Sequence, residues 1–145
     1  PSHPKNSGIC KEVVEEFGPN IPILGVCLGH QVIGYTYDSI IEKAPTIFHG
    51  KTSLIEHNSN ELFEGVPSPF NAMRYHSLII NEKSLSNDFE KIAWTTEGIV
   101  MGISHNKFPL YGIQFHPESI GTEFGEKILL NFLNLWYEKY YWNKY

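Results

Sequence analysis

The spacing of apolar residues along the chain predicts an alternation of helices and short strands. Residues 8–17 have the 3.6-residue periodicity of a helix, which Gly18-Pro19 ends. The apolar face of this helix comprises Ile9, Val13, Val14 and Phe17. The uninterrupted apolar run 21–24 then predicts a buried strand, and the residues from 29 onward can start a second helix.

Five more strands are predicted after this unit, in segments rich in β-branched and aromatic residues. Their ranges are 46–57, 70–80, 89–95, 99–105 and 110–115. A polar turn at 58–60 and a short helical turn at 61–65 separate the first two of these strands. Turn residues at 97–98 and 106–109 separate the last three.

A last helix is predicted to begin near Thr122. Thr122 can cap its N-terminus, and Glu123 and Glu126 are well placed there because carboxylates interact favourably with the positive end of the helix dipole. The apolar stripe of this helix comprises Ile128, Leu129, Phe132, Leu133, Trp136 and Tyr140. Neither an internal repeat nor a low-complexity linker divides the chain, so residues 1–145 are predicted to form one domain.

The sequence Gly25-Val26-Cys27-Leu28-Gly29 follows directly on the first buried strand. It has the G-x-C-x-G form of a nucleophile elbow, with sulfur in place of the serine oxygen. A cysteine on such a turn lies beside a helix N-terminus, which lowers its pKa. The two glycines matter because side chains at their positions would crowd so sharp a turn. Taken alone, the motif leaves open whether Cys27 is a nucleophile or a small buried residue.

The partners that a nucleophilic cysteine needs follow the last predicted strand, in His116-Pro117-Glu118. In an extended chain, residues two apart point to the same side, so His116 and Glu118 share a face. Pro117 fixes its own φ and biases His116 toward extended geometry. A carboxylate beside an imidazole selects its tautomer, and the imidazole can then take a thiol proton. Together, the two motifs favour Cys–His–Glu acyl transfer over a purely structural histidine.

Four segments closely resemble class I (triad) glutamine amidotransferases. They are residues 22–31 (Pro-Ile-Leu-Gly-Val-Cys-Leu-Gly-His-Gln), 49–53 (His-Gly-Lys-Thr-Ser), 74–78 (Arg-Tyr-His-Ser-Leu) and 112–119 (Gly-Ile-Gln-Phe-His-Pro-Glu-Ser). Within that superfamily, segments 49–53 and 74–78 are similar to the glutaminase subunit of anthranilate synthase. The glutaminase subunit of aminodeoxychorismate synthase is a near twin. The motifs occur in the family's order and span nearly the whole chain.

The resemblance implies an α/β fold of the flavodoxin-like type, an open mixed sheet flanked by helices. It also implies an incomplete domain that lacks its N-terminal strands, because the chain begins at Pro1 without methionine. The family has the end of a glycine- and proline-rich loop at this point, and that loop supplies a second oxyanion N–H. We therefore expect the 145-residue chain alone to have little glutaminase activity, since the loss of one oxyanion donor costs about 3–4 kcal/mol of transition-state stabilisation.

The resemblance further implies catalytic roles for four residues. Cys27 would attack the side-chain amide of glutamine, and a glutamyl thioester would form. His116 would shuttle the proton to the leaving ammonia and then activate water, while Glu118 orients the imidazole. The backbone N–H of Leu28, at the helix N-terminus, would bind the oxyanion.

Three residues would hold the substrate glutamine, again by resemblance. Gln31 lies one helical turn after Cys27, so its side chain can reach the same pocket. The main chain at Ser77 and Leu78 would bind the amino-acid end. The alternatives are a solvent-facing helix residue for Gln31 and a turn hydroxyl for Ser77.

The implied partner is a separate chorismate-binding synthase subunit (component I), which would receive the ammonia for tryptophan biosynthesis. The main alternative is the aminodeoxychorismate synthase of p-aminobenzoate and folate biosynthesis. An inactive glutaminase-like scaffold is a further alternative. A γ-glutamyl peptidase is disfavoured by segments 49–53 and 74–78, and a plain flavodoxin-like binding module explains neither the elbow nor His116-Pro117-Glu118.

The segment Tyr37-Asp38-Ser39 departs from the family, which usually has a glycine pair after the elbow helix. Glycine ends a helix cheaply in the left-handed conformation. Asp38 tolerates that conformation better than most residues, so we expect a strained turn and an intact fold.

Composition narrows the class of protein. A net charge of −5 without a basic run disfavours nucleic-acid binding, and no apolar stretch reaches membrane-spanning length. Two cysteines give no disulfide framework, and Cys10 is expected to be a packed helix residue. Cys27 must stay a thiol, which fits the cytoplasm or a plastid stroma.

The remaining polar residues suggest little further chemistry. His49 and Lys51 either line the surface that faces the synthase subunit or belong to a solvated turn. Arg74 is expected to be an anchoring salt-bridge residue rather than a substrate clamp. The histidines His3, His57 and His105 lack metal-ligand spacing. We therefore predict neither a metal site nor a cofactor.

Overall fold

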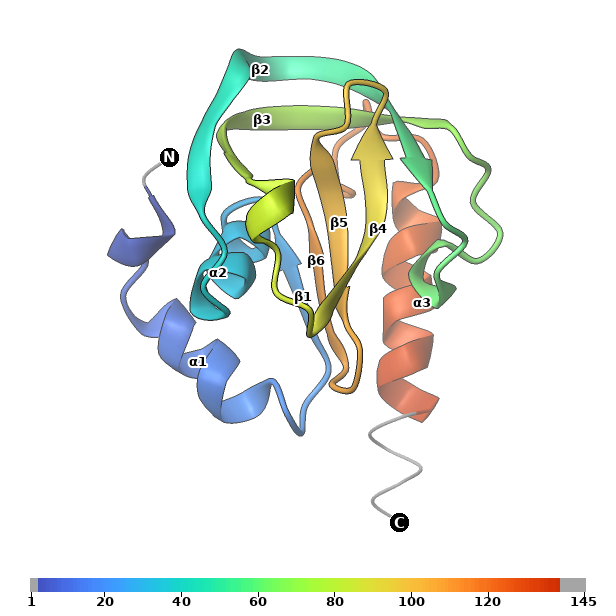
Figure 1. The fold of residues 1–145 in the computed structure, drawn as a ribbon. Helices are drawn as coiled ribbons and strands as arrows, with labels where there is room; N and C mark the ends of the chain where they lie inside the picture. Colours follow the sequence, from blue (N-terminus) through green and yellow to red (C-terminus); the bar gives the residue numbers. More distant parts are fainter. Residues whose placement is uncertain (1–2, 139–145) are drawn as a thin grey trace.

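The computed structural model describes residues 3–138 as one mixed sheet with helices on both faces (Figure 1). The strands are β1 (Ile23–Val26), β2 (Ile41–His57), β3 (Phe70–Ile80), β4 (Phe89–Thr95), β5 (Val100–His105) and β6 (Leu110–Ile113). The helices are α1 (Ile9–Phe17), α2 (Leu28–Thr36) and α3 (Gly125–Trp136), with short 3₁₀ turns η1 (Pro4–Asn6), η2 (Glu61–Phe63) and η3 (Glu82–Ser84). The α/β class and the open mixed sheet expected from the sequence are confirmed.

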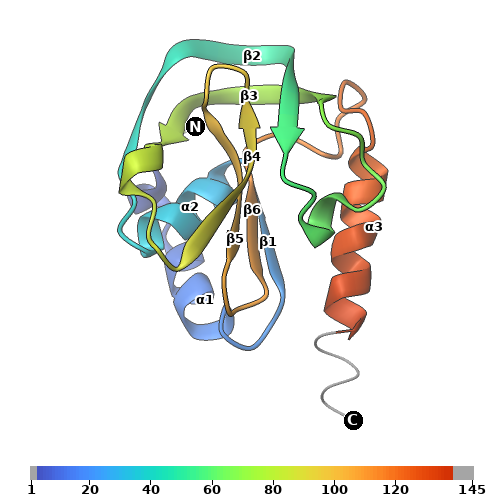
Figure 2. The same cartoon turned by 45° about the vertical axis from the view of Figure 1, so that its right-hand side comes forward.

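The strand order is β1-β6-β5-β4-β2-β3. β1 and β6 pair in parallel, with Val26 opposite Ile113, and the other neighbours pair antiparallel. Strands β2 and β3 form a long hairpin that curls across the ends of the other strands (Figure 2). A parallel pair ends at a common edge of the sheet, so the residues that follow β1 and β6 are neighbours in space.

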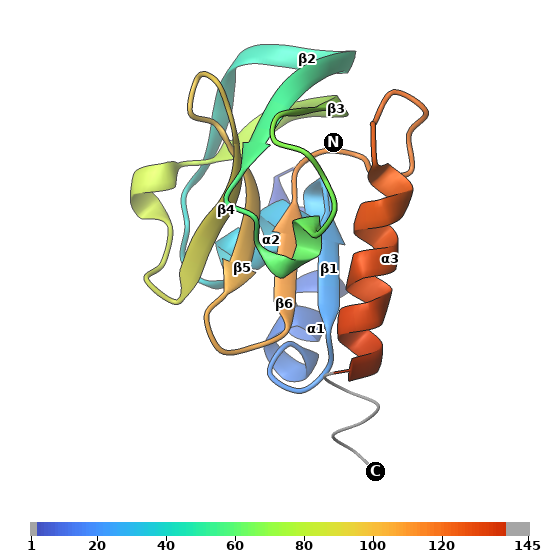
Figure 3. The same ribbon diagram turned by 90° about the vertical axis from the view of Figure 1, so that its right-hand side faces the viewer.

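Both faces of the sheet are covered, α1 and α2 lying on one side and α3 on the other (Figure 3). The residues of β5 and β6 are all buried, which is expected of central strands packed on two faces. The core on the α3 side includes Ile55, Phe63, Phe70, Phe115 and Ile128. The core on the α1–α2 side includes Val14, Val32, Ile33, Ile103 and Leu110.

The predicted strands correspond closely to the observed ones except for the first, which is predicted to be buried over 21–24 and lies at Ile23–Val26, where only Gly25 is fully buried. The ranges expected for β3 and β4 are the observed ranges, whereas β2 begins earlier, at Ile41, and β6 ends earlier, at Ile113. The turn after α2 is also as expected, because Asp38 has a positive φ of 67°. Its N–H donates to the Tyr35 carbonyl and the Ser39 N–H to that of Gly34, which closes the helix without a glycine.

The packing expected for α1 is wrong in part. Val14 is buried, but Ile9 is 69% exposed, and Val13 and Phe17 are exposed as well. Cys10 is also exposed, so it is not the packed residue expected from the sequence. The physical reason is the position of α1 beside β1, which pairs on one side only among the described strands and gives the helix little sheet to cover.

The start of α3 also differs from the prediction. The residue before the helix is Phe124, in a left-handed conformation, and not Thr122. The Thr122 hydroxyl is instead committed to the backbone of a neighbouring turn, where it donates to the His116 carbonyl at 2.6 Å. Leu133 is exposed rather than part of the apolar stripe, and Tyr140 lies outside the described residues.

The elbow between β1 and α2 requires a glycine at position 25. A Cβ built on Gly25 would lie 2.6 Å from the Gly29 backbone and 2.7 Å from the Ile33 side chain. A Cβ on Gly29 itself would meet nothing within 4 Å. The steric demand expected of both glycines is therefore concentrated at Gly25.

We predict that Gly25→Ala lowers the free energy of unfolding by about 1–3 kcal/mol, because the added methyl group must displace packed backbone. Gly29→Ala is the matched control and should leave that free energy unchanged or slightly higher. Urea unfolding followed by circular dichroism measures both. Equal effects of the two substitutions would contradict the steric interpretation.

Candidate active site

Cys27 lies at the sharp turn between β1 and α2. Its backbone has φ 55° and ψ −104°, a combination that a non-glycine residue adopts only under constraint. The Cys27 N–H donates to the carbonyl of Ile113 at 2.8 Å, which extends the parallel β1–β6 ladder by one residue. The strained turn is thus fixed by sheet pairing on one side and by the start of α2 on the other.

The sulfur of Cys27 has two hydrogen-bond partners. Its thiol donates to the backbone carbonyl of Tyr75 at 3.5 Å, and it accepts from Nε2 of Gln114 at 3.7 Å. Burial raises the pKa of the Cys27 thiol, an effect opposed by the Leu28 N–H and by Gln114 and reinforced by the Glu118 carboxylate. The lowered pKa expected for a cysteine at this helix N-terminus is therefore wrong, because burial outweighs the Leu28 N–H.

His116 and Glu118 lie together as the sequence predicts. Nδ1 of His116 is 2.6 Å from Oε1 of Glu118. The other ring nitrogen, Nε2, is buried and has no hydrogen-bond partner among residues 3–138. The Tyr75 ring packs edge-on against the imidazole, with ring centroids 5.3 Å apart. The imidazole is thus oriented on one side by a carboxylate and keeps its second nitrogen available for proton transfer.

The backbone around His116 is held by β3 and by the turn before α3. The His116 N–H donates to the Met73 carbonyl at 3.0 Å, and the Met73 N–H donates to the Thr122 hydroxyl at 2.9 Å. A Cβ built on Gly125 would lie 1.8 Å from the Pro117 carbonyl oxygen, so the first residue of α3 packs directly on the turn. Thr122 and Gly125 therefore fix the turn that carries His116.

A narrow recess joins the nucleophile to the predicted substrate residues. Its lining residues are Cys27, Leu28, Gln31, Tyr75, His76, Ser77 and Leu78. The cavity volume is about 10 Å³, roughly the space of one water molecule. The structure thus brings five of the seven predicted site residues into one wall, while His116 and Glu118 lie beside it against Tyr75.

Gln31 is buried in this recess and both hydrogens of its NH₂ group are engaged. Nε2 donates to the carbonyl of Leu78 and to Oε1 of Gln114, both at 3.0 Å. The alternative of a solvent-facing residue at position 31 is therefore wrong. Gln114 lies within a motif that the sequence singles out, but only the structure brings its side chain between Gln31 and Cys27.

Arg74 anchors the β2–β3 hairpin without an ion pair among the described residues. It is 1% exposed, and it donates through Nε to His76 and through a terminal nitrogen to Ser53. The guanidinium lies 3.5 Å from the centre of the Phe48 ring, a cation–π contact. The prediction that Arg74 forms a salt bridge is therefore wrong. Burial lowers the pKa of Arg74 to about 10.

Two buried histidines lie on the elements that form the recess, His30 on α2 and His76 on β3. Burial lowers the pKa of His30 to about 3, and burial together with the Arg74 charge lowers that of His76 to about 4. His30 packs against Gly112, where an added Cβ would lie 2.8 Å from the imidazole. Both rings are neutral at physiological pH, whereas His49 and Lys51 are exposed on β2.

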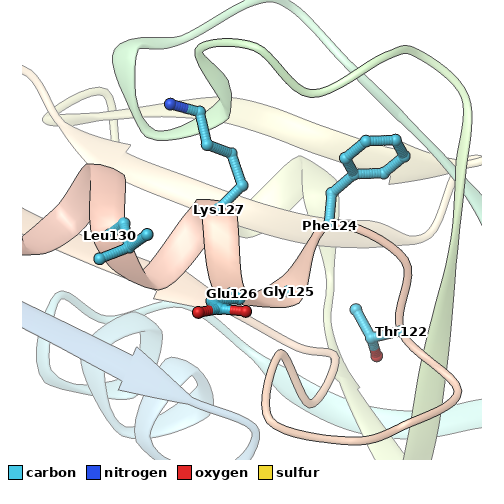
Figure 4. Close-up of a pocket in the computed structure, with 6 residues that line it drawn as sticks. All are labelled: Thr122, Phe124, Gly125, Glu126, Lys127 and Leu130. Carbon is cyan, nitrogen blue, oxygen red and sulfur yellow. The ribbon is translucent and has the colours of Figure 1, made fainter.

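A wider opening lies elsewhere, at the start of α3 (Figure 4). It has a volume of about 490 Å³ and is lined by Thr122, Phe124, Gly125, Glu126, Lys127 and Leu130. The side chains of Glu126 and Lys127 point away from each other, so no polar groups converge there as they do at Cys27 (Figure 4).

Two further features bear on the class of protein. Residues 3–138 contain no group of three histidine, cysteine or acidic side chains that could hold a metal ion. None of the helices in this range is long and apolar enough to cross a membrane.

Comparison with known sequences gives one family. The family described as glutamine amidotransferase class-I matches residues 1–136. Anthranilate synthase component 2 of Cyanophora paradoxa is 50% identical over 135 residues, covering 92% of this chain and 71% of the relative. The aminodeoxychorismate/anthranilate synthase component 2 of Bacillus subtilis is 47% identical over 133 residues, covering 92% and 69%.

Solved structures show the same fold. A putative GMP synthase protein from Thermoplasma acidophilum superposes with a TM-score of 0.80 at 28% identity, over 91% of this chain and 64% of the other. A glutamine amidotransferase from Thermotoga maritima has a TM-score of 0.63 at 18% identity, over 90% and 51%, and supports the fold alone. The chain thus spans less than two thirds of the solved chains that it matches.

The buried histidines predict loss of stability in mild acid. Since the folded-state pKa values of His30 and His76 lie below the ordinary 6.5, the unfolded chain binds protons more readily between pH 6.5 and about 4. Each histidine should then lower the free energy of unfolding by about 1.4 kcal/mol per pH unit in that window. Urea unfolding at pH 7.5 and pH 5.5 measures the loss.

The matched variants are His76→Gln, which keeps an acceptor for Arg74, and His49→Gln on the exposed part of β2. The first should reduce the loss between the two pH values by about 1.4 kcal/mol, and the second should leave it unchanged. A His76→Gln protein that loses as much stability as the wild type would contradict the assignment.

Proposed function

Because the chain belongs to the class-I glutamine amidotransferase family, we propose that it is the glutaminase component of an anthranilate synthase. It would release ammonia from glutamine and pass it to a chorismate-converting subunit in tryptophan biosynthesis. The observation that carries this proposal is that a strained cysteine elbow and an imidazole–carboxylate pair follow two parallel strands at one edge of the sheet, and that both contact Tyr75. We further propose that residues 1–145 form a single amidotransferase domain.

The chemical steps follow from the groups around Cys27. His116 takes the thiol proton, and the sulfur adds to the side-chain carbonyl carbon of glutamine. The tetrahedral intermediate collapses as its carbon–nitrogen bond breaks, and the proton on His116 leaves with ammonia. His116 then deprotonates a water molecule, which hydrolyses the glutamyl thioester to glutamate, and the imidazolium gives that proton to the departing sulfur. Glu118 stabilises the imidazolium at each transfer, since it accepts from Nδ1.

The developing oxyanion is stabilised at the N-terminus of α2. The Leu28 N–H is the first of the helix and lacks an intrahelical acceptor, so it can donate to the carbonyl oxygen of the substrate. The same N–H also acts to lower the pKa of the Cys27 thiol and so favours the thiolate. One backbone group thus supports both the nucleophile and the intermediate.

Gln31, Ser77 and Leu78 are proposed to hold the substrate. They line the recess at Cys27, and the Leu78 carbonyl already accepts from the Gln31 amide. Because the recess has room for about one water, the β3 segment that carries Ser77 and Leu78 must move away from α2 for glutamine to enter. This segment belongs to the curled hairpin, which is attached to the sheet through β4.

The proposed partner is a separate chorismate-binding synthase subunit. The support is that the relatives from Cyanophora paradoxa and Bacillus subtilis are both named as a second component. The name of the Bacillus subtilis relative also supports an alternative product, aminodeoxychorismate. A thiol that must stay reduced is consistent with a location in the cytoplasm or a plastid stroma.

We predict that the glutamine analogue 6-diazo-5-oxo-L-norleucine labels the full-length protein once, at Cys27. We expect this labelling because Cys27 attacks the electrophilic carbon that the analogue has in place of the amide. Cys27→Ser should abolish labelling, and His116→Asn should slow it by about a hundredfold or more. Peptide mass spectrometry locates the adduct.

Cys10→Ser provides the matched control, since Cys10 is exposed and lies on α1. It should leave the labelling stoichiometry unchanged. An adduct on Cys10, or one that persists in Cys27→Ser, would refute the role of Cys27.

We also predict that the full-length protein copurifies from its native source with a chorismate-binding subunit. The complex should convert chorismate and glutamine to anthranilate, identified by mass spectrometry, and Cys27→Ser should abolish the glutamine-dependent reaction only. Aminodeoxychorismate as the product would establish the alternative pathway. A complex that uses ammonia but never glutamine would show that this chain acts as a scaffold.

A further inference from the structure

Gln114 lies directly after β6 and its side chain is completely buried. Its backbone N–H donates to the Met101 carbonyl at 2.9 Å, which fixes the residue against β5. Its amide lies between the sulfur of Cys27 and the amide of Gln31. A buried amide that contacts the proposed nucleophile can act on the chemistry of the sulfur as well as on packing.

We propose that Gln114 is a further catalytic residue, whose side-chain N–H stabilises the Cys27 thiolate and whose orientation is set by Gln31. The inference rests on the proposed glutaminase function for its biological meaning. Its physical content, a hydrogen bond that favours ionised sulfur, is independent of the substrate.

The hydrogen bonds fix the direction of both amides. The Leu78 backbone carbonyl can only accept, so the Gln31 NH₂ group must face it. That same NH₂ group reaches Gln114 at 3.0 Å and can only donate, so the carbonyl end of Gln114 must face Gln31. The NH₂ end of Gln114 is then directed at the sulfur, 3.7 Å away. Turning either amide by 180° would bring like groups together.

The two partners of the sulfur favour different protonation states. The Tyr75 carbonyl accepts from the neutral thiol, and a thiolate has no proton to give it. The Gln114 amide donates, and a hydrogen bond to an ionised acceptor is the stronger kind. Because burial and the Glu118 carboxylate both oppose ionisation, the Gln114 donor acts against the main costs of forming the thiolate. An amide does not titrate, so this support is present at every working pH.

The hydrogen bonds that run from Leu78 through Gln31 and Gln114 also connect the sulfur to the proposed substrate residues. Leu78 and Gln31 line the recess, and two hydrogen bonds lead from them to the amide that contacts Cys27. A displacement of Leu78 or Gln31 when glutamine enters would therefore free the Gln114 amide to reorient. Occupancy of the recess and the ionisation of sulfur are coupled through these two hydrogen bonds.

The test is the pH dependence of Cys27 alkylation by iodoacetamide in the full-length protein, with Cys10→Ser as the background so that one cysteine reacts. Gln114→Met keeps the approximate shape and removes the donor. The midpoint of the rate profile should rise by about one pH unit, which is a tenfold fall in thiolate at pH 7. In the glutaminase assay, kcat should fall while KM stays the same.

Two other variants keep the inference testable. Gln114→Glu places a negative charge beside the sulfur and should raise the midpoint further, so it tests the contact between position 114 and the sulfur if Gln114→Met fails to fold. Asn131→Leu is the matched control, because Asn131 is a buried amide on α3 that bonds to the Leu62 and Glu64 carbonyls. It should lower stability without moving the midpoint.

An unchanged midpoint in Gln114→Met or in Gln114→Glu would overturn the proposal. So would an equal shift in Asn131→Leu, since that would indicate a general effect of lost stability. Iodoacetamide needs no substrate site, so a shifted midpoint without labelling by the glutamine analogue would refute the glutaminase function and leave the role of Gln114 intact. Labelling by the glutamine analogue without a shifted midpoint would refute the role of Gln114 and leave the glutaminase function intact.

Discussion

The parallel pairing of β1 with β6 is the constraint on which the site depends. It sets Val26 opposite Ile113, so the segments that follow the two strands leave the sheet at the same edge. Cys27 follows one strand, and Gln114 and His116 follow the other. The hydrogen bond from the Cys27 N–H to the Ile113 carbonyl continues the pairing into the elbow itself. Residues almost ninety positions apart are thereby brought to one edge of the sheet by the pairing of these two strands.

The β2–β3 hairpin supplies the other wall of the site through its backbone. The carbonyls of Met73, Tyr75 and Leu78, all on β3, bind the His116 N–H, the Cys27 thiol and the Gln31 amide respectively. Backbone contacts of this kind depend on the position of the strand more than on its side chains. The buried Arg74, held by His76, Ser53 and the Phe48 ring, fixes the two strands of the hairpin to each other.

The sequence predicts most of this architecture because periodicity and motifs are local properties. The ranges of β3 and β4, the elbow at Cys27 and the His116–Glu118 contact all follow from patterns within a few residues. What the sequence does not predict depends on neighbours distant in the chain. The exposed face of α1 results from the position of β1 at the edge of the sheet that residues 3–138 form. The Thr122 hydroxyl leaves its expected capping role because His116 and Met73 lie within reach. The link from Gln31 through Gln114 to sulfur likewise exists only in three dimensions.

The hydrogen bond from the Cys27 thiol to the Tyr75 carbonyl has a consequence for the durability of the protein. Peroxide and other oxidants attack thiolates far faster than thiols, and a sulfenic acid at this position would end catalysis until reduced. While the recess is closed, the thiol is partly buried, burial raises its pKa, and it donates to a backbone carbonyl. The contact that keeps the nucleophile at rest therefore also shields it from oxidative damage between turnovers.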